Sequence, residues 1–255
     1  MKKDLHIALI EFDIAWENPS ANLIFLESEF EKYQGNDLII LPEMFSTGFT
    51  NNTLVAEKMD GDSVLFLQKW SKKLNCAIAG SLFIQEKNLF YNRFVFVYPD
   101  GKIEYYNKNH LFTFANEHNK ISAGTEQKII NYLGWKINLL ICYDLRFPVW
   151  CRNTPENFYD LSIVVANWPE SRVFAWESLL TARAIENQSY FIGVNRIGKD
   201  GKNLIYNGNS KVVDPLGKNL ENHDNNYILS QEFLEKIRQD FPFLKDQNQF
   251  KILKN

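Results

Sequence analysis

Apolar runs and amphipathic segments alternate along the chain from its first residues onward. Residues 5–12 predict a strand, and Asn18-Pro19 provides an N-cap and a first helical residue for a helix expected to continue to Gln34, with Gly35 ending it. Inside this helix, apolar residues recur at intervals of three and four, so they share one face suited to packing on a sheet. These apolar residues are Leu23, Leu26, Phe30 and Tyr33.

Short runs of consecutive apolar residues predict strands that are covered on both faces. Residues 37–41 (Asp-Leu-Ile-Ile-Leu) form such a run, which Pro42 stops. We expect further strands at 76–84, 89–98, 102–106, 128–132, 136–141, 161–166 and 189–195, and two late strands near 209–213 and 227–230. Helical patterns occupy 63–74, 174–186 and 231–238, and a short helix is expected after Arg146. Residues 99–102 predict a hairpin turn, and 110–124 an irregular stretch.

Hairpin signals and strand-helix alternation occur together in this chain. That mixture favours a layered α/β sandwich over a purely doubly wound sheet. The sequence contains no linker, low-complexity segment, internal repeat or shift in composition. We therefore expect residues 1–255 to form one domain.

Composition and charge exclude several classes of protein. Of the 255 residues, 45% are hydrophobic and 23% charged, which disfavours disorder and coiled coils. Lys and Arg number 28 against 31 Asp and Glu, so a nucleic-acid partner is not indicated. No apolar run reaches the roughly 18 to 20 residues that cross a bilayer, and the first residues do not resemble a signal peptide, so we expect a soluble cytoplasmic protein without a membrane partner.

Three cysteines without CxxC spacing indicate neither a disulfide framework nor a metal site. Cys142 directly follows the apolar strand 137–141, where a nucleophile would lie at the carboxyl edge of a sheet with backbone N–H groups free to hold an oxyanion. Its local sequence alone is more often that of a small hydrophobe packed at a strand end. Cys76 and Cys151 occur in contexts typical of structural residues.

Candidate acid-base groups follow two other strands. The sequence around each of the four histidines indicates neither a catalytic base nor a set of metal ligands. These residues are His6, His110, His118 and His223. Glu43 comes just after the buried strand 37–41, and Lys108 lies among aromatic residues after the strand 102–106. Taken alone, Glu43 could be a solvated loop residue, and Lys108 could extend along the neighbouring rings. What these residues share with Cys142 is a strand-end position.

Three segments together resemble the nitrilase superfamily of carbon-nitrogen hydrolases. Residues 41–43 (Leu-Pro-Glu), 106–112 (Tyr-Asn-Lys-Asn-His-Leu-Phe) and 142–148 (Cys-Tyr-Asp-Leu-Arg-Phe-Pro) are similar to the segments that carry its Glu-Lys-Cys triad, in the same order. The similarity continues through residues 166–169, 182–187 and 214–217, so it covers essentially the whole chain. Residues 42–49, 114–118 and 168–172 are most similar to bacterial ω-amidases.

This resemblance implies a four-layer αββα sandwich, a homodimer formed through a helical layer, and no cofactor. It implies that Glu43 is the general base, that Cys142 is the nucleophile forming a thioester, and that Lys108 with the backbone N–H of Tyr143 holds the oxyanion. Glu117 is similar to a second glutamate of the superfamily, which would orient Lys108 or the substrate amide, or merely pair with a cation.

The ω-amidases hydrolyse the terminal amide of 2-oxo-dicarboxylic acid monoamides such as 2-oxoglutaramate and 2-oxosuccinamate. A guanidinium suits the far carboxylate of such a small-molecule substrate, and Arg172 is the candidate, with Arg146 nearer to Cys142 as the alternative. Candidate pocket walls are Phe45, Phe114 and Trp168.

Three other functions compete with this one. A nitrilase or an N-carbamoyl amidase would use the same triad with a different pocket. A non-catalytic binding protein could keep the fold, although all three triad residues are present. A redox sensor could pair Cys142 with Cys151, nine residues later.

Overall fold

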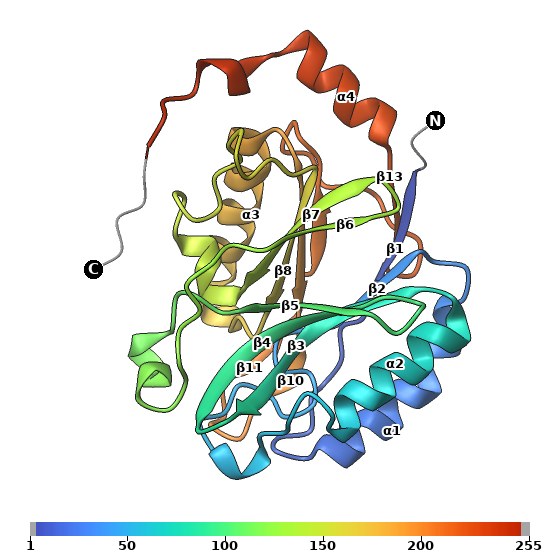
Figure 1. The fold of residues 1–255 in the computed structure, drawn as a ribbon, viewed down its shortest axis with the longest axis vertical. Helices are drawn as coiled ribbons and strands as arrows, with labels where there is room; N and C mark the ends of the chain where they lie inside the picture. Colours follow the sequence, from blue (N-terminus) through green and yellow to red (C-terminus); the bar gives the residue numbers. More distant parts are fainter. Residues whose placement is uncertain (1–3, 251–255) are drawn as a thin grey trace.

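Two β-sheets face each other in the computed structural model, which describes residues 4–250, and helices cover their outer faces (Figure 1). The first sheet has the strand order β13-β1-β2-β3-β4-β5. Its strands are β1 (Leu5–Leu9), β2 (Leu38–Ile40), β3 (Ala77–Glu86), β4 (Leu89–Val97), β5 (Ile103–Asn107) and β13 (Asn226–Leu229). This arrangement confirms the expected αββα sandwich.

The second sheet has the order β12-β9-β8-β7-β6, with β7, β8 and β9 parallel. Its strands are β6 (Ile129–Tyr132), β7 (Trp135–Ile141), β8 (Leu161–Ala166), β9 (Tyr190–Asn195) and β12 (Lys211–Val213). A separate hairpin consists of β10 (Ile197–Lys199) and β11 (Ile205–Asn207). The helices are α1 (Pro19–Glu29), α2 (Asp62–Leu74), α3 (Val173–Asn187) and α4 (Gln231–Asp240).

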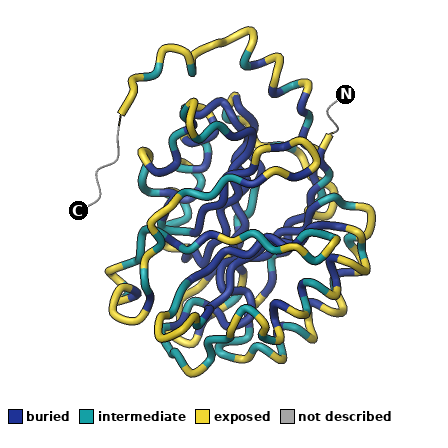
Figure 2. Tube along the Cα trace, in the orientation of Figure 1, coloured by how far each residue is buried: buried dark blue, intermediate teal, exposed yellow. Residues whose placement is uncertain are grey.

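Alternate residues along the strands of the first sheet pack into two different core layers, one on each face of the sheet. In β1, Leu5 and Ile7 belong to the cluster shared with the second sheet, whereas Ala8 belongs to the cluster under α1 and α2. Because successive strand residues point to opposite faces, one apolar strand serves both layers. Figure 2 shows the resulting band of buried chain between the exposed outer segments.

The start of α1 matches its sequence signals. The Asn18 side chain accepts a hydrogen bond from the Ala21 backbone N–H at 3.2 Å, and Pro19 is the first helical residue. The α-helix ends at Glu29, earlier than expected, because the chain continues as the 3₁₀ helix Phe30–Tyr33 before Gly35 turns it at a φ of +94°.

The structure differs from the sequence expectations at two places that border the site. The prediction of a short helix after Arg146 is wrong. A 3₁₀ helix instead occupies Cys142–Arg146, so it begins at the cysteine itself. The hairpin β10–β11 was not expected, since its strands have three residues each and are too short to show a period. Within residues 4–250, no helix is long and apolar enough to span a bilayer.

Candidate active site

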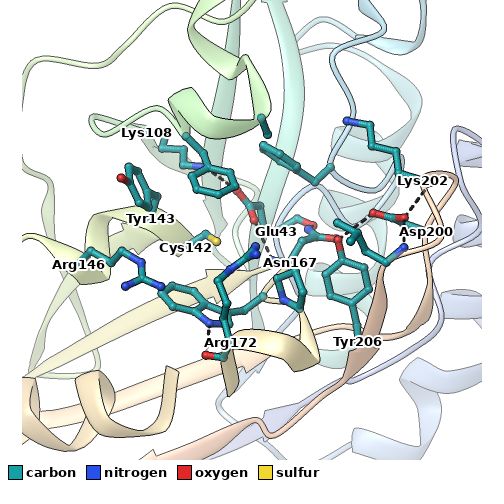
Figure 3. A pocket seen from close by; sticks show the side chains of 16 residues that line it. Glu43, Lys108, Cys142, Tyr143, Arg146, Asn167, Arg172, Asp200, Lys202 and Tyr206 are labelled. Carbon is teal, nitrogen blue, oxygen red and sulfur yellow. Dashed lines mark hydrogen bonds and ion pairs between the residues drawn. The ribbon is translucent and has the colours of Figure 1, made fainter. Parts of the chain in front are cut away.

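A pocket opens where β2, β5, β7 and β8 end, and Figure 3 shows side chains from these segments pointing into it. Its volume is about 590 Å³, including the space open to solvent at the mouth. Aromatic rings form much of the wall, and the hairpin β10–β11 contributes one side. Its charged lining residues are Glu43, Lys108, Arg146, Arg172, Asp200 and Lys202.

Three charged side chains form a buried cluster on one wall of this pocket. Lys108 Nζ lies 2.9 Å from Glu43 Oε1 and 3.0 Å from Glu117 Oε2. None of the three side chains is more than 1% exposed. Two carboxylates and one ammonium carry a net charge of about −1 when all are ionised. In a buried site without water, hydrogen-bond donors of the protein must stabilise that charge. The backbone N–H of Phe112 supplies one such donor to Glu117.

Glu43 lies in the loop after β2 and is held by hydrogen bonds from the segment after β8. The backbone N–H of Asn167, which follows β8, donates to Glu43 Oε2 at 2.8 Å, and the Asn167 amide donates to the Glu43 carbonyl oxygen at 2.6 Å. Met44 has a φ of +44°, an uncommon conformation for a residue with a side chain, so surrounding contacts must hold this turn. A carboxylate in such a loop has its orientation fixed by the protein itself.

Cys142 lies at a sharp turn between β7 and its 3₁₀ helix. Its φ is +43°, and Asp144 braces the turn by accepting the Ile141 backbone N–H at 3.0 Å and the Tyr106 hydroxyl at 2.9 Å. The first two N–H groups of a 3₁₀ helix have no acceptor within the helix, and here they belong to Cys142 and Tyr143. The turn therefore places a thiol beside backbone donors that an oxyanion can use.

Electrostatics in this cluster keep the thiol protonated and the lysine charged. Burial raises the pKa of Cys142, the negative charge of Glu43 raises it further, and Lys108 opposes both. Burial alone would lower the pKa of Lys108, but Glu117 and Glu43 outweigh it and raise that pKa above the ordinary value. Burial also raises the pKa of Glu117, while Lys108 lowers it. Cys142 consequently needs a neighbouring base to become a nucleophile.

Two arginines line the pocket without an ionic partner among residues 4–250. The Arg146 guanidinium lies 4.8 Å from the Trp168 ring, and that of Arg172 lies 5.6 Å from the Phe112 ring. Trp168 also donates its indole N–H to the Arg172 carbonyl oxygen at 2.8 Å, which fixes the wall. A guanidinium held against a ring and lacking a carboxylate is suited to binding an anion.

The structure brings most of the sequence-predicted site residues to this pocket. They are Glu43, Lys108, Cys142, Tyr143, Trp168 and Arg172, with Glu117 directly behind Lys108. Phe45 and Phe114 do not line it. Phe45 is fully buried in the core between the first sheet and its helices, and Phe114 is 84% exposed on the 3₁₀ turn Thr113–Ala115.

Sequence reasoning missed several residues of the site. Asn167 follows the predicted strand 161–166, so the strand-end criterion that selected Glu43 could have found it. Asn92 lies inside β4, a mostly apolar strand, and its local sequence carried no signal of a site. The lining residues from the hairpin were missed together with the hairpin; they are Asp200, Lys202, Leu204 and Tyr206.

The remaining candidate chemistry lies elsewhere. Cys151 is buried, and its thiol bonds to the Asp144 carbonyl oxygen at 3.4 Å, so it faces the core rather than the pocket. Burial raises its pKa, which disfavours its use as a resolving thiol. In the chain between residues 4 and 250, no group of three or more His, Cys, Asp or Glu is placed to hold a metal ion.

Comparison with protein families and curated proteins gives concordant matches. A family model described as carbon-nitrogen hydrolase matches residues 7–228. The chain is 40% identical over 254 residues to omega-amidase YafV of Escherichia coli (strain K12), covering 97% of this chain and 98% of that protein. It is 35% identical over 219 residues to 2-oxoglutaramate amidase of Bacillus subtilis (strain 168), covering 84% of each.

Solved structures agree with these matches. XC1258 from Xanthomonas campestris, described as a CN-hydrolase superfamily protein with an arsenic adduct in its active site, gives a TM-score of 0.94 at 39% identity, covering 98% of this chain and 99% of that one. Nit3 of Saccharomyces cerevisiae, a member of branch 10 of the nitrilase superfamily, gives 0.82 at 23% identity, covering 94% and 95%. The second likeness concerns the fold alone.

Proposed function

The chain belongs to the carbon-nitrogen hydrolase family, and from this premise we propose that it is an ω-amidase that hydrolyses the terminal amide of 2-oxoglutaramate or 2-oxosuccinamate to the 2-oxo acid and ammonia. The observation that carries the proposal is that one pocket is lined by Glu43, Lys108 and Cys142 and by two arginines that have no carboxylate partner among residues 4–250. The first set suits amide hydrolysis, and the second suits an acidic substrate.

In the proposed acylation step, Glu43 takes the proton from the Cys142 thiol, and the sulfur attacks the amide carbon. The oxygen of the tetrahedral intermediate is stabilised by the Lys108 ammonium and the Tyr143 backbone N–H, contacts that are often worth about 3 to 4 kcal/mol per donor. Glu43 then gives its proton to the leaving nitrogen. The C–N bond breaks, ammonia departs, and a thioester to Cys142 remains.

In the deacylation step, Glu43 acts as base a second time. It removes a proton from a water molecule, whose oxygen attacks the thioester carbon, and the same two donors hold the second oxyanion. Breaking the C–S bond returns the proton to sulfur and releases the acid. The Lys108 charge is required in both steps, and Glu117 keeps that ammonium in place through contacts of 3.0 and 3.1 Å.

The pocket charge supports selection of a 2-oxo acid over an amino acid. Arg146, Arg172 and Lys202 add three positive charges to the lining. The Asp200 carboxylate is occupied by the Tyr206 hydroxyl and by two backbone N–H groups of its own loop. A carboxylate substrate is therefore attracted, whereas the ammonium of glutamine is placed beside like charges.

Replacing Arg172 by Gln is expected to raise the KM for 2-oxoglutaramate by roughly 10- to 100-fold with a smaller change in kcat, because a charged hydrogen bond to the substrate carboxylate is lost. Steady-state ammonia release measures both constants. Arg146→Gln is the matched variant, since its guanidinium lines the same pocket against a different ring. An unchanged KM in both variants would exclude an arginine as the carboxylate ligand.

Product analysis separates the proposed function from its relatives. The wild-type protein is incubated with 2-oxoglutaramate, 2-oxosuccinamate, an N-carbamoyl amino acid and an aliphatic nitrile. Ammonia with the matching 2-oxo acid is expected from the first two. Release of carbon dioxide together with ammonia would instead identify a carbamoylase. Turnover of the nitrile alone would identify a nitrilase, and the absence of any turnover would indicate a binding protein.

We also propose a homodimer formed through α3. Phe174 and Ile185 are 81% and 50% exposed, and because they are three helical turns apart they share one face. Leu216 is exposed beside this face, since Gly217 lies against Ile185. Exposed apolar residues gathered in this way suit an interface. Analytical ultracentrifugation of the wild type is expected to show a dimer, and that of Phe174→Glu a monomer. A monomeric wild type would contradict this interface.

We further propose that residues 1–255 act as one catalytic domain, since both sheets contribute to a single core cluster between them. A cytoplasmic location is proposed because the cysteines are free thiols and a cysteine nucleophile must stay reduced.

A further inference from the structure

We propose that Asn92 is a positioning residue of the hydrolytic reaction, one that holds the carboxylates of Glu43 and Glu117 against Lys108 so that Glu43 stays available as a base. This proposal rests on the proposed function for its kinetic consequences. It does not rest on that function for the geometry, which involves only the protein itself.

Asn92 contacts every member of the buried charged cluster. It lies inside β4 and is fully buried. Its side-chain nitrogen donates to Glu43 Oε1 at 2.7 Å and reaches Glu117 Oε1 at 3.4 Å. Its carbonyl oxygen accepts the Lys108 backbone N–H at 2.9 Å. One residue thus connects both carboxylates to the strand end that carries the lysine.

Ser81 on β3 fixes which way the Asn92 amide points. The Ser81 hydroxyl oxygen accepts the Met44 backbone N–H at 2.8 Å, so its own proton is directed to Asn92 Oδ1, also at 2.8 Å. An amide whose oxygen is occupied in this way must present its N–H groups to the carboxylates. The Ser81 backbone carbonyl oxygen accepts the Phe45 backbone N–H at 3.1 Å, which holds the Glu43 loop against the same strand.

The charge balance explains why an amide is needed here. The same two oxygens, Glu43 Oε1 and Glu117 Oε1, both lie next to Lys108 Nζ and next to Asn92 Nδ2. Two buried carboxylates this close would share a proton unless donors stabilise both charges. Lys108 supplies one positive charge, and the amide supplies two N–H groups without adding charge. A carboxylate in its place would remove both donors and add repulsion.

The groups that face the Glu43 carboxylate come from every element around it. They are Lys108 after β5, Glu117 on the 3₁₀ helix Glu117–Asn119, Cys142 after β7, the backbone N–H of Asn167 after β8, and Asn92 on β4. Lys108 and Asn167 remain in any Asn92 variant. Loss of the amide is therefore expected to let the two carboxylates share a proton, which leaves less Glu43 able to accept one from Cys142, rather than to empty the site.

The test compares Asn92→Asp with the wild type, because aspartate has the same shape but no N–H groups. We expect kcat for 2-oxoglutaramate to fall by about 100-fold or more while KM changes by less than about threefold, since general base catalysis contributes roughly 10²- to 10⁴-fold. The acidic limb of the kcat/KM profile is expected to move to higher pH. Ser81→Ala is expected to show the same pattern with about a tenfold loss, because the amide can then rotate.

The matched control is Asn138→Asp. Asn138 on β7 is also buried and donates to a serine, Ser162 on β8, at 3.1 Å, without contacting the charged cluster. Its kcat and pH profile are expected to remain those of the wild type, whatever its stability. If Asn92→Asp does not fold by circular dichroism, Ser81→Ala decides. A wild-type kcat and pH profile in the folded variant would overturn the proposal.

A second readout separates this proposal from the proposed function. The rate at which iodoacetamide alkylates Cys142 needs no substrate and reports how readily Glu43 and Lys108 generate the thiolate. Asn92→Asp is expected to slow it by at least about tenfold at neutral pH. An unchanged alkylation rate would overturn the role of Asn92. Inactivity of the wild type toward all amides, with slowed alkylation in the variant, would overturn only the ω-amidase function.

Discussion

Ammonia release from 2-oxoglutaramate is expected to fall by at least about 10⁴-fold in Cys142→Ala, because the covalent route disappears with the only thiol that faces Glu43 and Lys108 within residues 4–250. The fold is expected to persist, since the substitution removes one atom from a partly exposed side chain. Ammonia release at saturating substrate, with circular dichroism for folding, checks both statements.

Cys76→Ala is the matched control for this prediction. Cys76 is buried under α2 in the outer core of the first sheet, and its thiol donates to the carbonyl oxygen of Ala77 at 3.2 Å, away from the pocket. Its removal is expected to cost stability but to leave kcat within about twofold. If Cys142→Ala retained a tenth or more of the wild-type activity, a thioester at Cys142 would be ruled out.

Lys108→Met is expected to lower both activity and stability. The oxyanion loses its ammonium, which predicts a decrease in kcat of roughly 10²- to 10³-fold. Two buried carboxylates lose their shared cation, and breaking a buried ion pair from one side typically costs about 3 to 5 kcal/mol. Methionine keeps the volume of the side chain, so the loss reflects charge rather than a cavity. Urea denaturation and ammonia release measure the two effects.

The stability loss in Lys108→Met is expected to depend on pH. Burial already raises the pKa of Glu117, and removing Lys108 removes the charge that lowers it. A carboxyl whose folded pKa lies above its unfolded value stabilises the fold below the unfolded pKa and loses that stabilisation as pH rises through the folded one. The difference from wild type should therefore be smaller near pH 5 than near pH 8.

The control for this prediction is Lys128→Met, which removes a lysine paired with Glu104 at the surface. Such pairs contribute about 0 to 1 kcal/mol, so little change in stability and none in kcat is expected. Equal losses in Lys128→Met and Lys108→Met, or a loss in Lys108→Met that is independent of pH, would contradict the charged cluster.

Strand-end position was the most informative sequence feature of the site. Glu43 and Cys142 each follow a continuous apolar run, and such runs predict buried strands whose carboxyl ends meet at one edge. The 65 positions between Glu43 and Lys108 hide this proximity from any local motif. The resemblance to a known family indicated that Glu43, Lys108 and Cys142 belong to one site, and the structure gives the distances between the side chains of Glu43 and Lys108.

What the sequence could not predict depends on contacts between distant elements. Phe45 and Phe114 are both aromatic residues near motif segments, yet one packs into the core and the other faces solvent. Polar partners such as Asn92 lie within mostly apolar strands, and their role becomes visible only from contacts with the neighbouring strand and the Glu43 loop. The hairpin β10–β11 has three-residue strands, which carry too few positions for a periodic pattern.

The most direct test of an ω-amidase pocket is the ratio of kcat/KM for 2-oxoglutaramate to that for glutamine, since the two differ only at the 2-position. The pocket is lined by the cations Arg146, Arg172 and Lys202. The ammonium group of bound glutamine would lie beside these like charges, whereas the 2-oxo group of 2-oxoglutaramate can accept hydrogen bonds from them. We expect 2-oxoglutaramate to be favoured by at least about tenfold. A ratio of one or less would contradict the assignment, because the cationic wall would then play no part in choosing the substrate.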